Sequence, residues 1–595
     1  MYRPISLFLS ATLLAALLVS PFAMLMAAQK PNVVLVITDD QGYGDLSCHG
    51  NEVLKTPNID ELFRESVRLT DYHVSPTCSP TRAALQTGHW TNRTGVWHTI
   101  MGRSLLRENE VTIGQVFKEG GYATGMFGKW HLGDNYPYRP EDRGYTEVMR
   151  HGGGGVGQTP DYWDNAYFDG SYFHNGKPEA VDGFCTDVWF DYAKRFIRNQ
   201  KKADKPFFAY ISTNAPHGPM HSPVKSSNPY KDLKVNVQNF FGMIANIDDN
   251  VGQLREFLDD EGLTENTIFI FTTDNGSSSG DKVFNAGMRG KKGSEYDGGH
   301  RVPFFMHWPK GGIVGGRDVT ELTAHVDVLP TLIKMCGVGA PANVEFDGRN
   351  IFALLNRRAA AWPDRILITD SQRVKDPIKW RKSAVMTTRW RLNNGKELYD
   401  IKADPGQTKN VATDHAPVVH RLTAFYDAWW DELTPTFAQD CSIYLGHPAD
   451  NPATLTCHDW ITTGTTPWNH ASVRSAMSGG ANTGFWNVKI VEAGSYEIRI
   501  RRWPQESDQA IDAALPPGAD VPGAQAYRAR PGKAFHAIKA TIDIGGQSAE
   551  TAVASGDKEA VFNLKLSAGV TRLSSRFMSA DGKEIGGYYA YVKKL

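Results

Sequence analysis

The sequence predicts an α/β fold: a mostly parallel sheet flanked by helices, followed by a small α+β C-terminal subdomain and an appended all-β sandwich. Three observations support this prediction. Short apolar runs alternate with helical patterns over the first part of the chain. After about residue 437 the pattern changes to an alternation with a period of two. The chain has 595 residues, of which 41% are hydrophobic, enough for more than one core.

Five apolar runs are the expected strands of the first sheet, and helical patterns lie between them. Residues 32–37 form a continuous β-branched run, which suits a buried strand. The other runs are 123–127, 206–212, 268–273 and 303–307. Residues 111–119 and 240–258 show the helical pattern. Together these elements make up the expected α/β domain, residues 30–346.

A smaller unit is expected over residues 347–435. Residues 365–369 and 383–392 are each predicted to be a strand, and Asn393-Asn394-Gly395 is a turn signal. An apolar stripe at helical spacing follows, formed by Val418, Leu422, Phe425, Trp429 and Leu433. We therefore expect a small sheet covered by one helix.

The last unit, residues 437–595, is predicted to be the sandwich. Trp486, Val488 and Ile490 alternate with polar residues, and residues 496–501, 538–544 and 562–566 repeat the same period. Breaks rich in Gly and Pro separate these runs, as in antiparallel sandwiches.

The N-terminus has the features of a secretory signal peptide, residues 1–28. Arg3 supplies a positive charge, residues 5–19 are mostly apolar, and Ala27 and Ala28 precede the expected cleavage site. We expect an exported protein, periplasmic or secreted, with no stable membrane span after cleavage. An uncleaved signal anchor is the alternative.

Charge and cysteine content narrow the classes further. The net charge of −1 argues against a polyanion-binding surface over the whole protein, so nucleic acid is not an expected partner. Six cysteines are few for a disulfide scaffold. Cys441 and Cys457 lie close in sequence, and a bridge between them is an option that the sequence alone does not establish. The remaining cysteines outside the Cys78 motif, namely Cys48, Cys185 and Cys336, are expected to be buried thiols.

Four of the predicted strands run directly into polar clusters. In chain order these are Asp39-Asp40, Gly128-Lys129-Trp130-His131, Asn214-Ala215-Pro216-His217 and Asp274-Asn275-Gly276. In open α/β sheets, sites form outside the carboxyl ends of the strands. The short oxygen-bearing side chains of Asp39, Asp40, Asp274 and Asn275 suit a hard divalent cation, calcium or magnesium. Taken alone, two aspartates after a strand also fit a turn and a helix N-cap.

Residues 78–88 predict a short helix with a cysteine at its start. Ser79 suits the N-cap, Pro80 the first helical position, and Gly88 the C-terminus. Cys78 would then lie at the positive end of the helix, with Arg82 one turn on along the same face. This arrangement favours chemistry on an oxyanion, whereas the alternative is an inert, packed thiol.

These motifs together resemble the type I, formylglycine-dependent sulfatases, which are arylsulfatase-like members of the alkaline phosphatase superfamily. The resemblance rests on C-x-P-x-R at Cys78, G-K-W-H-L-G at 128–133, P-H-x-P at 216–219 and the glycine-rich segment 290–303, and it covers residues 31–435. It implies that Cys78 is oxidised to formylglycine by a formylglycine-generating enzyme. It also implies a calcium ion, with magnesium less expected, held by Asp39, Asp40, Asp274, Asn275 and the modified Cys78.

The resemblance implies roles for the remaining polar residues. Lys129, His217 and Lys292 would bind the sulfate, and Arg82 would lie near the nucleophile. His131 would assist recovery of the aldehyde, and His217 would act as general acid, since the histidine pKa is near working pH. The register favours Lys292 over Lys291 as the sulfate ligand. The family's usual glutamate before Gly298 is replaced by Asp297.

The expected function is hydrolysis of sulfate esters on a sulfated small molecule or oligosaccharide. Two alternatives remain: a phosphodiester or phosphonate monoester hydrolase of the same superfamily, and a non-catalytic glycan-binding protein. His221 is expected to be a pocket wall. The glycines of 151–155 and the aromatic residues of 162–168 either border a sugar pocket or form a surface loop packed by its own side chains.

Overall fold

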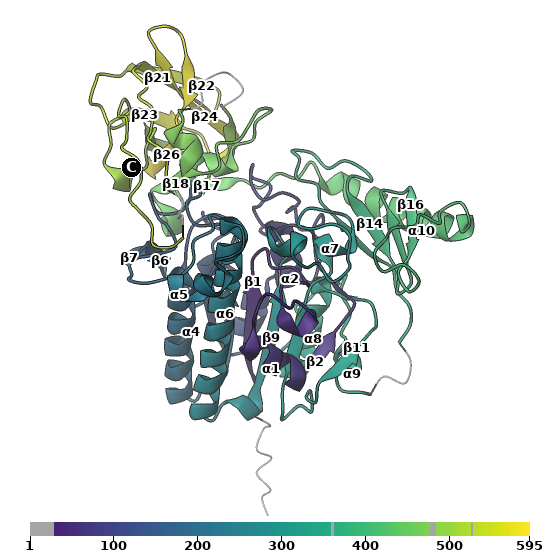
Figure 1. The fold of residues 1–595 in the computed structure, drawn as a ribbon. Coiled ribbons are helices and arrows are strands. Elements are labelled where there is room, and N and C mark those ends of the chain that lie inside the picture. The colour runs from purple at the N-terminus through teal and green to yellow at the C-terminus, as the bar shows by residue number, and fades with distance from the viewer. Residues whose placement is uncertain (1–28, 359–361, 477–482, 525–527) are drawn as a thin grey trace, which may run out of the picture. The chain divides into compact units, whose positions relative to one another are not determined.

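A computed structural model describes residues 29–358, 362–476, 483–524 and 528–595 (Figure 1). The predicted signal peptide, residues 1–28, therefore lies outside the described residues. None of the described helices is both long and apolar enough to cross a membrane. The boundaries of the three expected units stay predictions.

The first part of the chain forms a ten-stranded mixed sheet with helices on both faces. In spatial order its strands are β11 (Arg317–Val319), β2 (Val67–Leu69), β10 (Phe304–His307), β9 (Thr267–Thr273), β1 (Asn32–Thr38), β8 (Phe207–Ser212), β4 (Ala123–Gly128), β5 (Glu147–Arg150), β6 (Ser171–His174) and β7 (Lys177–Ala180). The central strands β9, β1, β8, β4 and β5 are parallel. The predicted strand at 303–307 is present as β10, but it runs antiparallel to β9.

Two apolar cores cover the two faces of this sheet. Alternate residues of β1 point to opposite faces, so Val33, Leu35 and Ile37 join one core while Val34 and Val36 join the other. The first core contains α2 (Cys78–Thr87), α3 (Ile113–Glu119) and α8 (Val328–Cys336). The second contains α1 (Pro57–Glu65), α4 (Cys185–Lys202) and α6 (Val235–Asp260), and α4 and α6 lie side by side (Figure 1). Burial on both faces explains why β1 is a continuous apolar run.

The second unit is a four-stranded antiparallel sheet covered by α10 (Ala416–Leu433). Its strands are β13 (Leu367–Asp370), β14 (Ser383–Met386), β15 (Trp390–Asn393) and β16 (Glu397–Asp400). The single strand predicted at 383–392 is wrong, because the chain turns back between β14 and β15. The Thr387 hydroxyl accepts the backbone N–H groups of Arg389 and Trp390 there, so a threonine makes the turn without Gly or Pro.

The apolar stripe predicted on α10 is only partly correct. Leu422, Trp429 and Leu433 are buried, but Phe425 is 40% exposed. Tyr426 and Trp430 take its place in the core. Each of these two residues comes directly after a position of the predicted stripe. Their rings carry a polar group, so a pattern that counts only apolar residues does not include them.

Arg391 of β15 connects this small sheet to the α/β part. Its fully buried guanidinium donates to Asp297 Oδ1 at 3.0 Å and to Asp71 Oδ1 at 2.7 Å. Asp297, the aspartate that replaces the expected glutamate, is therefore the carboxylate partner of this arginine.

The C-terminal unit contains two antiparallel-rich sheets that share one apolar core, as in a sandwich. One sheet has the order β17 (Ile443–Leu445), β19 (Phe485–Ile490), β24 (Gly569–Ser579), β21 (Ala537–Ile544) and β22 (Gln547–Ala552), with β25 (Glu584–Gly586) beside β24. The other has β18 (Ala453–Thr456), β26 (Tyr589–Lys594), β20 (Gly494–Arg501) and β23 (Ala560–Leu566).

All six cysteines lie within the described residues, and all are free thiols. The bridge considered between Cys441 and Cys457 is therefore absent. Each thiol donates to a different carbonyl instead, Cys441 to Leu105 at 3.3 Å and Cys457 to Pro467 at 2.9 Å.

Candidate active site

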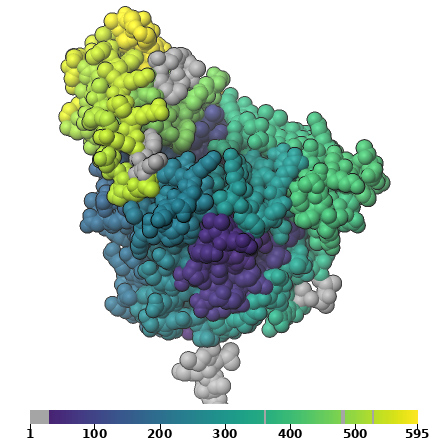
Figure 2. Space-filling model, viewed as in Figure 1, coloured from purple at the N-terminus to yellow at the C-terminus, as the bar shows by residue number. Residues whose placement is uncertain are grey.

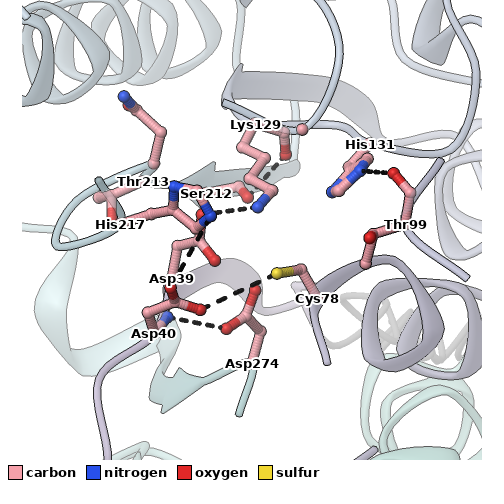
Figure 3. A network of polar contacts seen from close by, with 12 residues as sticks. Asp39, Asp40, Cys78, Thr99, Lys129, His131, Ser212, Thr213, His217 and Asp274 are labelled. Atoms are coloured by element: carbon pink, nitrogen blue, oxygen red, sulfur yellow. Dashed lines mark hydrogen bonds and ion pairs between the residues drawn. The ribbon is translucent and has the colours of Figure 1, made fainter. Parts of the chain in front are cut away.

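The carboxyl ends of four neighbouring strands bring the predicted polar residues to one edge of the sheet (Figure 3). Asp39 and Asp40 follow β1, Lys129 follows β4, and Asp274 follows β9. Because β9, β1, β8 and β4 are mutually parallel neighbours, their ends meet in space although the residues are up to 235 positions apart. The structure thus brings every predicted metal and sulfate residue into one cluster, in which only His217 and Lys292 are partly exposed.

Cys78 lies at the first position of α2, which starts two residues earlier than expected. Thr77 is the N-cap residue, so the prediction that Ser79 caps the helix is wrong. Gly88 ends the helix at φ 71° as predicted. The Cys78 side chain is buried, and its Sγ lies 3.9 Å from Asp40 Oδ1. Burial, reinforced by Asp39, raises the pKa of the unmodified thiol to about 12, so it stays protonated and unreactive.

Arg82, one turn after Cys78, holds Asp274 in place. Its guanidinium donates to Asp274 Oδ2 at 2.7 and 3.1 Å, and both side chains are fully buried. It also donates to the Ser212 hydroxyl, which in turn donates to the Lys129 carbonyl at 2.7 Å. Sequence reasoning missed Ser212, because a serine at the end of an apolar strand carries no motif.

Two lysines neutralise the two aspartates that follow β1. Lys129 Nζ lies 2.6 Å from Asp39 Oδ2, with both side chains inaccessible to solvent. Lys292 Nζ lies 2.6 and 2.7 Å from the two Asp40 oxygens. Burial alone would raise the pKa of Asp40, but Lys292 and His217 outweigh it and hold that pKa well below its usual value. Lys291 instead faces Asp281 at 3.6 Å and is half exposed, which favours Lys292 as the site residue.

His131 is a neutral base with a free lone pair. Its Nε2 donates to the Thr99 carbonyl at 2.8 Å, which leaves the lone pair on Nδ1, and Nδ1 has no hydrogen-bond partner among the described residues. Burial and the Lys129 charge hold its pKa well below the usual value. The chain does not continue β4 in an extended conformation here, because His131 itself has φ 62°. The side-chain directions of Lys129 and His131 therefore result from the left-handed turn and not from strand alternation.

His217 sits at the mouth of the cluster with a defined tautomer. Its Nδ1 donates to the Gly218 carbonyl at 2.7 Å, and its Nε2 lies 3.8 Å from Asp40 Oδ2. Burial and Lys292 lower its pKa to about 4. The expectation of a pKa near neutrality is therefore wrong for the free protein, because burial and the charge of Lys292 disfavour the protonated ring.

The oxygen atoms of the cluster fit a hard divalent cation. Within the part of the chain that the structure describes, Asp39 Oδ1 and Asn275 Oδ1 are buried without a hydrogen-bond partner, which is costly unless a ligand or ion satisfies them. Donor atoms of Asp39, Cys78 and Asp274 lie within 4.8 Å of one another. Asp40 adds a further carboxylate, to which Asn275 Nδ2 donates at 3.0 Å. The residues present thus suit an ion that prefers oxygen ligands.

A further histidine, His458, reaches this cluster from the C-terminal unit. Its ring centre lies 6.0 Å from that of His131, and its Nε2 lies 3.1 Å from Gln158 Oε1. The separation of 300 residues between His458 and Gln158 explains why sequence patterns did not identify this contact.

Two family models match this chain. One, described as sulfatase, matches residues 31–338, and the other, described as N-sulphoglucosamine sulphohydrolase, C-terminal, matches residues 291–425. The chain is 32% identical to human arylsulfatase A over 366 residues, 57% of this chain and 70% of that protein. It is 30% identical to dog N-acetylgalactosamine-6-sulfatase over 353 residues, 55% of this chain and 66% of that protein.

A solved structure supports the same assignment. Ps i-CgsB in complex with k-i-k-neocarrahexaose is 26% identical, with a TM-score of 0.62 over 67% of this chain and 93% of that one. The cluster of basic and acidic side chains around the buried Cys78, at the ends of the strands, agrees with this assignment. The chain therefore belongs to the sulfatase family of the alkaline phosphatase superfamily, and it is a sulfuric ester hydrolase.

Proposed function

We propose that the chain hydrolyses sulfate esters on a carbohydrate, with formylglycine at position 78 and calcium bound by Asp39, Asp40, Asp274 and Asn275. The observation that carries this proposal is the environment of Cys78. A buried, unreactive thiol lies among three carboxylates and beside two lysines. A packing cysteine does not need such charges, whereas a site for a sulfate ester does.

The charged residues have different roles around the sulfate. When bound, the cation and the hydrated aldehyde would supply charge neutralisation and a nucleophilic hydroxyl. Lys129 and Lys292, each already held by an aspartate, offer ammonium groups to the sulfate oxygens. Arg82 keeps the Asp274 carboxylate oriented toward the cation site.

The two histidines suit opposite proton transfers. His131 presents the unprotonated Nδ1 of a buried neutral ring, which suits acceptance of a proton during recovery of the aldehyde. His217 has Nε2 facing the cluster. A bound, negatively charged sulfate opposes the effect of the lysines on this ring, so we propose that it acts as general acid only in the substrate complex.

The substrate class follows from the relatives. One relative is named for a sulfated N-acetylgalactosamine, and one solved neighbour holds a neocarrahexaose. We propose a sulfated oligosaccharide, met by an exported protein that a formylglycine-generating enzyme has modified. The sulfatase match favours this function over phosphodiester or phosphonate hydrolysis, and the complete set of charged side chains argues against a protein that only binds glycans.

Mass analysis of the peptide that contains position 78 tests the mechanism. We expect the mass of an aldehyde in place of the thiol, and Cys78→Ala should lower aryl sulfate turnover by at least about 10⁴-fold with an unchanged melting temperature. Cys48→Ala is the matched control, because Cys48 lies outside the cluster. Full turnover in Cys78→Ala would falsify the role of this residue.

A further inference from the structure

A cavity of about 770 Å³ opens beside His217, and several separate segments of the chain line it. The loop 156–171 and residues 217–221 supply one side, and they belong to the α/β part. Residues 468–471 and 518–522 supply the other side, and they belong to the C-terminal unit. A volume of this size is within the range of small-ligand sites. The aromatic loop at 162–168 therefore borders a cavity, which was one of its two expected roles.

Backbone and side-chain bonds fix the C-terminal wall of this cavity. His470 N–H donates to the Gly157 carbonyl at 3.0 Å, and Thr159 N–H donates to the Trp468 carbonyl at 3.0 Å. Farther along the same wall, the Asn239 amide of α6 donates to the Ala524 carbonyl at 3.0 Å. In Figure 2 the yellow-green surface of the C-terminal unit meets the teal surface of the α/β part.

An ion pair ties the aromatic loop to the same wall. Arg474 pairs with Asp164 at 2.6 Å and lies over the Trp163 ring at 5.2 Å. Trp163 also lies 4.4 Å from the His470 ring, measured between ring centres. Because these contacts cross from residue 164 to residue 474, the C-terminal unit is part of the cavity and not only a neighbour of it.

The chemistry of the cavity differs from that of the sulfate site. Aromatic side chains, Tyr162, Trp163, Phe168 and Trp468, are among its lining residues, together with the amides of Gln158, Asn165 and Asn469. No lysine or arginine is found among the described lining residues. Three carboxylates line it, and two of them have arginine partners: Asp164 pairs with Arg474 and Asp520 with Arg528.

Of the lining histidines, His470 adds no positive charge, because burial lowers its pKa to about 3. The described lining residues of the cavity thus include three aspartates and no lysine or arginine, whereas the sulfate site next to it holds Lys129 and Lys292. Rings and amides without cations suit the faces and hydroxyls of uncharged sugars.

Given the proposed sulfatase function, we infer that this cavity binds the uncharged sugar portion of the substrate and that the C-terminal unit forms one wall of the substrate site. The sulfate to be removed would lie at residue 78, and the adjoining sugar would lie between Tyr162 and Trp468. A second sulfate or a carboxylate on that sugar would meet the lining aspartates and no lysine or arginine of the described lining, because Arg474 and Arg528 are already paired with Asp164 and Asp520. The cavity therefore selects oligosaccharides of neutral sugars over those that contain uronic acids.

Competition against 4-nitrophenyl sulfate tests this inference with the full-length chain. The competitors are monosulfated galactose oligosaccharides, whose sugars are otherwise neutral, and chondroitin sulfate oligosaccharides, whose uronic acids add a carboxylate. We expect inhibition constants at least about tenfold lower for the neutral-sugar series. Equal or stronger inhibition by the uronic acid series, or no competition by either, overturns the inference.

Variants on both walls make the test specific. Trp468→Ala and Tyr162→Ala each remove a ring from the cavity. Each should therefore raise, by about tenfold, the ratio of the inhibition constant of the neutral-sugar series to the KM for 4-nitrophenyl sulfate. Val570→Ala is the matched control, since this residue of the C-terminal unit is 71% exposed and outside the cavity. An unchanged ratio in both wall variants overturns the role of the cavity, whereas failure of the wild type to hydrolyse any sulfate ester contradicts the proposed function itself.

Discussion

The charged cluster at residue 78 and the cavity beside it are built in opposite ways. In the cluster, Lys129 meets Asp39, Lys292 meets Asp40, and Arg82 meets Asp274, and the three aspartates lie at the ends of strands in one sheet. In the cavity, loops from two units meet, and lysine and arginine are absent from its described lining. Under the proposed function, recognition of the sulfate would depend on a framework of paired buried charges, whereas recognition of the sugar would depend on how two units join.

The largest expected effect is a loss of stability when a buried charge pair, and not an exposed one, is broken. Asp274→Ala leaves the fully buried Arg82 without its carboxylate, which should lower the free energy of unfolding by about 3–5 kcal/mol. Denaturant unfolding measures this change. Asp581→Ala is the control, because Asp581 and Lys583 form an exposed pair 2.6 Å apart, and its unfolding midpoint should not move. Equal effects in both variants would mean that the cluster is not a framework of buried charges.

A second prediction concerns acid stability on the cavity side. Burial, with Arg474 nearby, holds the pKa of His470 at about 3, against about 6.5 for an unfolded histidine. Between these values the unfolded chain takes up the proton and the folded protein does not. Above pH 6.5, His470 is neutral in both states and does not change the free energy of unfolding. As the pH falls toward 3, the free energy of unfolding decreases, by about 2 kcal/mol at pH 5.

The measurement is the free energy of unfolding at pH 7 and at pH 5, in the wild type and in His470→Gln. The variant should lose less stability between the two pH values than the wild type does. Identical pH slopes would show that His470 is already protonated, or solvated, in the folded protein.

The smallest expected effect lies where the two regions meet. A Cβ on Gly154 would lie 2.1–2.5 Å from three atoms of the His131 ring, so Gly154→Ala must displace that ring. We expect kcat for 4-nitrophenyl sulfate to fall about tenfold, with little change in KM. Gly155→Ala is the matched control, because its Cβ would meet neighbouring atoms only at 3.4 Å and beyond. A normal kcat in Gly154→Ala would exclude a role for the position of His131.

The charged cluster could be predicted from the sequence because its residues follow strands with clear apolar patterns. Asp39, Lys129 and Asp274 each come directly after a buried strand, and parallel neighbours place such positions together. Lys292 required the register of a glycine-rich segment as well. Ser212 could not be predicted in the same way, because its role depends on the path of the Arg82 side chain.

The cavity could not be predicted to the same extent. The aromatic loop at 162–168 stood out, but its partners Trp468 and His470 lie some 300 residues away, and no local pattern indicates such pairing. His458 beside His131 was missed for the same reason. The hairpin at 383–393 shows a local limit too, since the turn depends on the Thr387 hydroxyl and lacks the usual turn residues.

Arg391 has a practical consequence for anyone who wishes to trim this enzyme. Truncation near residue 346, where the sequence suggests a boundary, would delete Arg391, which pairs with both Asp71 and Asp297. Asp297 would then remain buried without this arginine, whereas Asp71, 15% exposed, would keep its contact with His73 at 2.8 Å. The small sheet thus supplies the arginine that neutralises Asp297. A shortened enzyme would need Asp297→Asn, or a basic side chain introduced near Asp297, to stay folded.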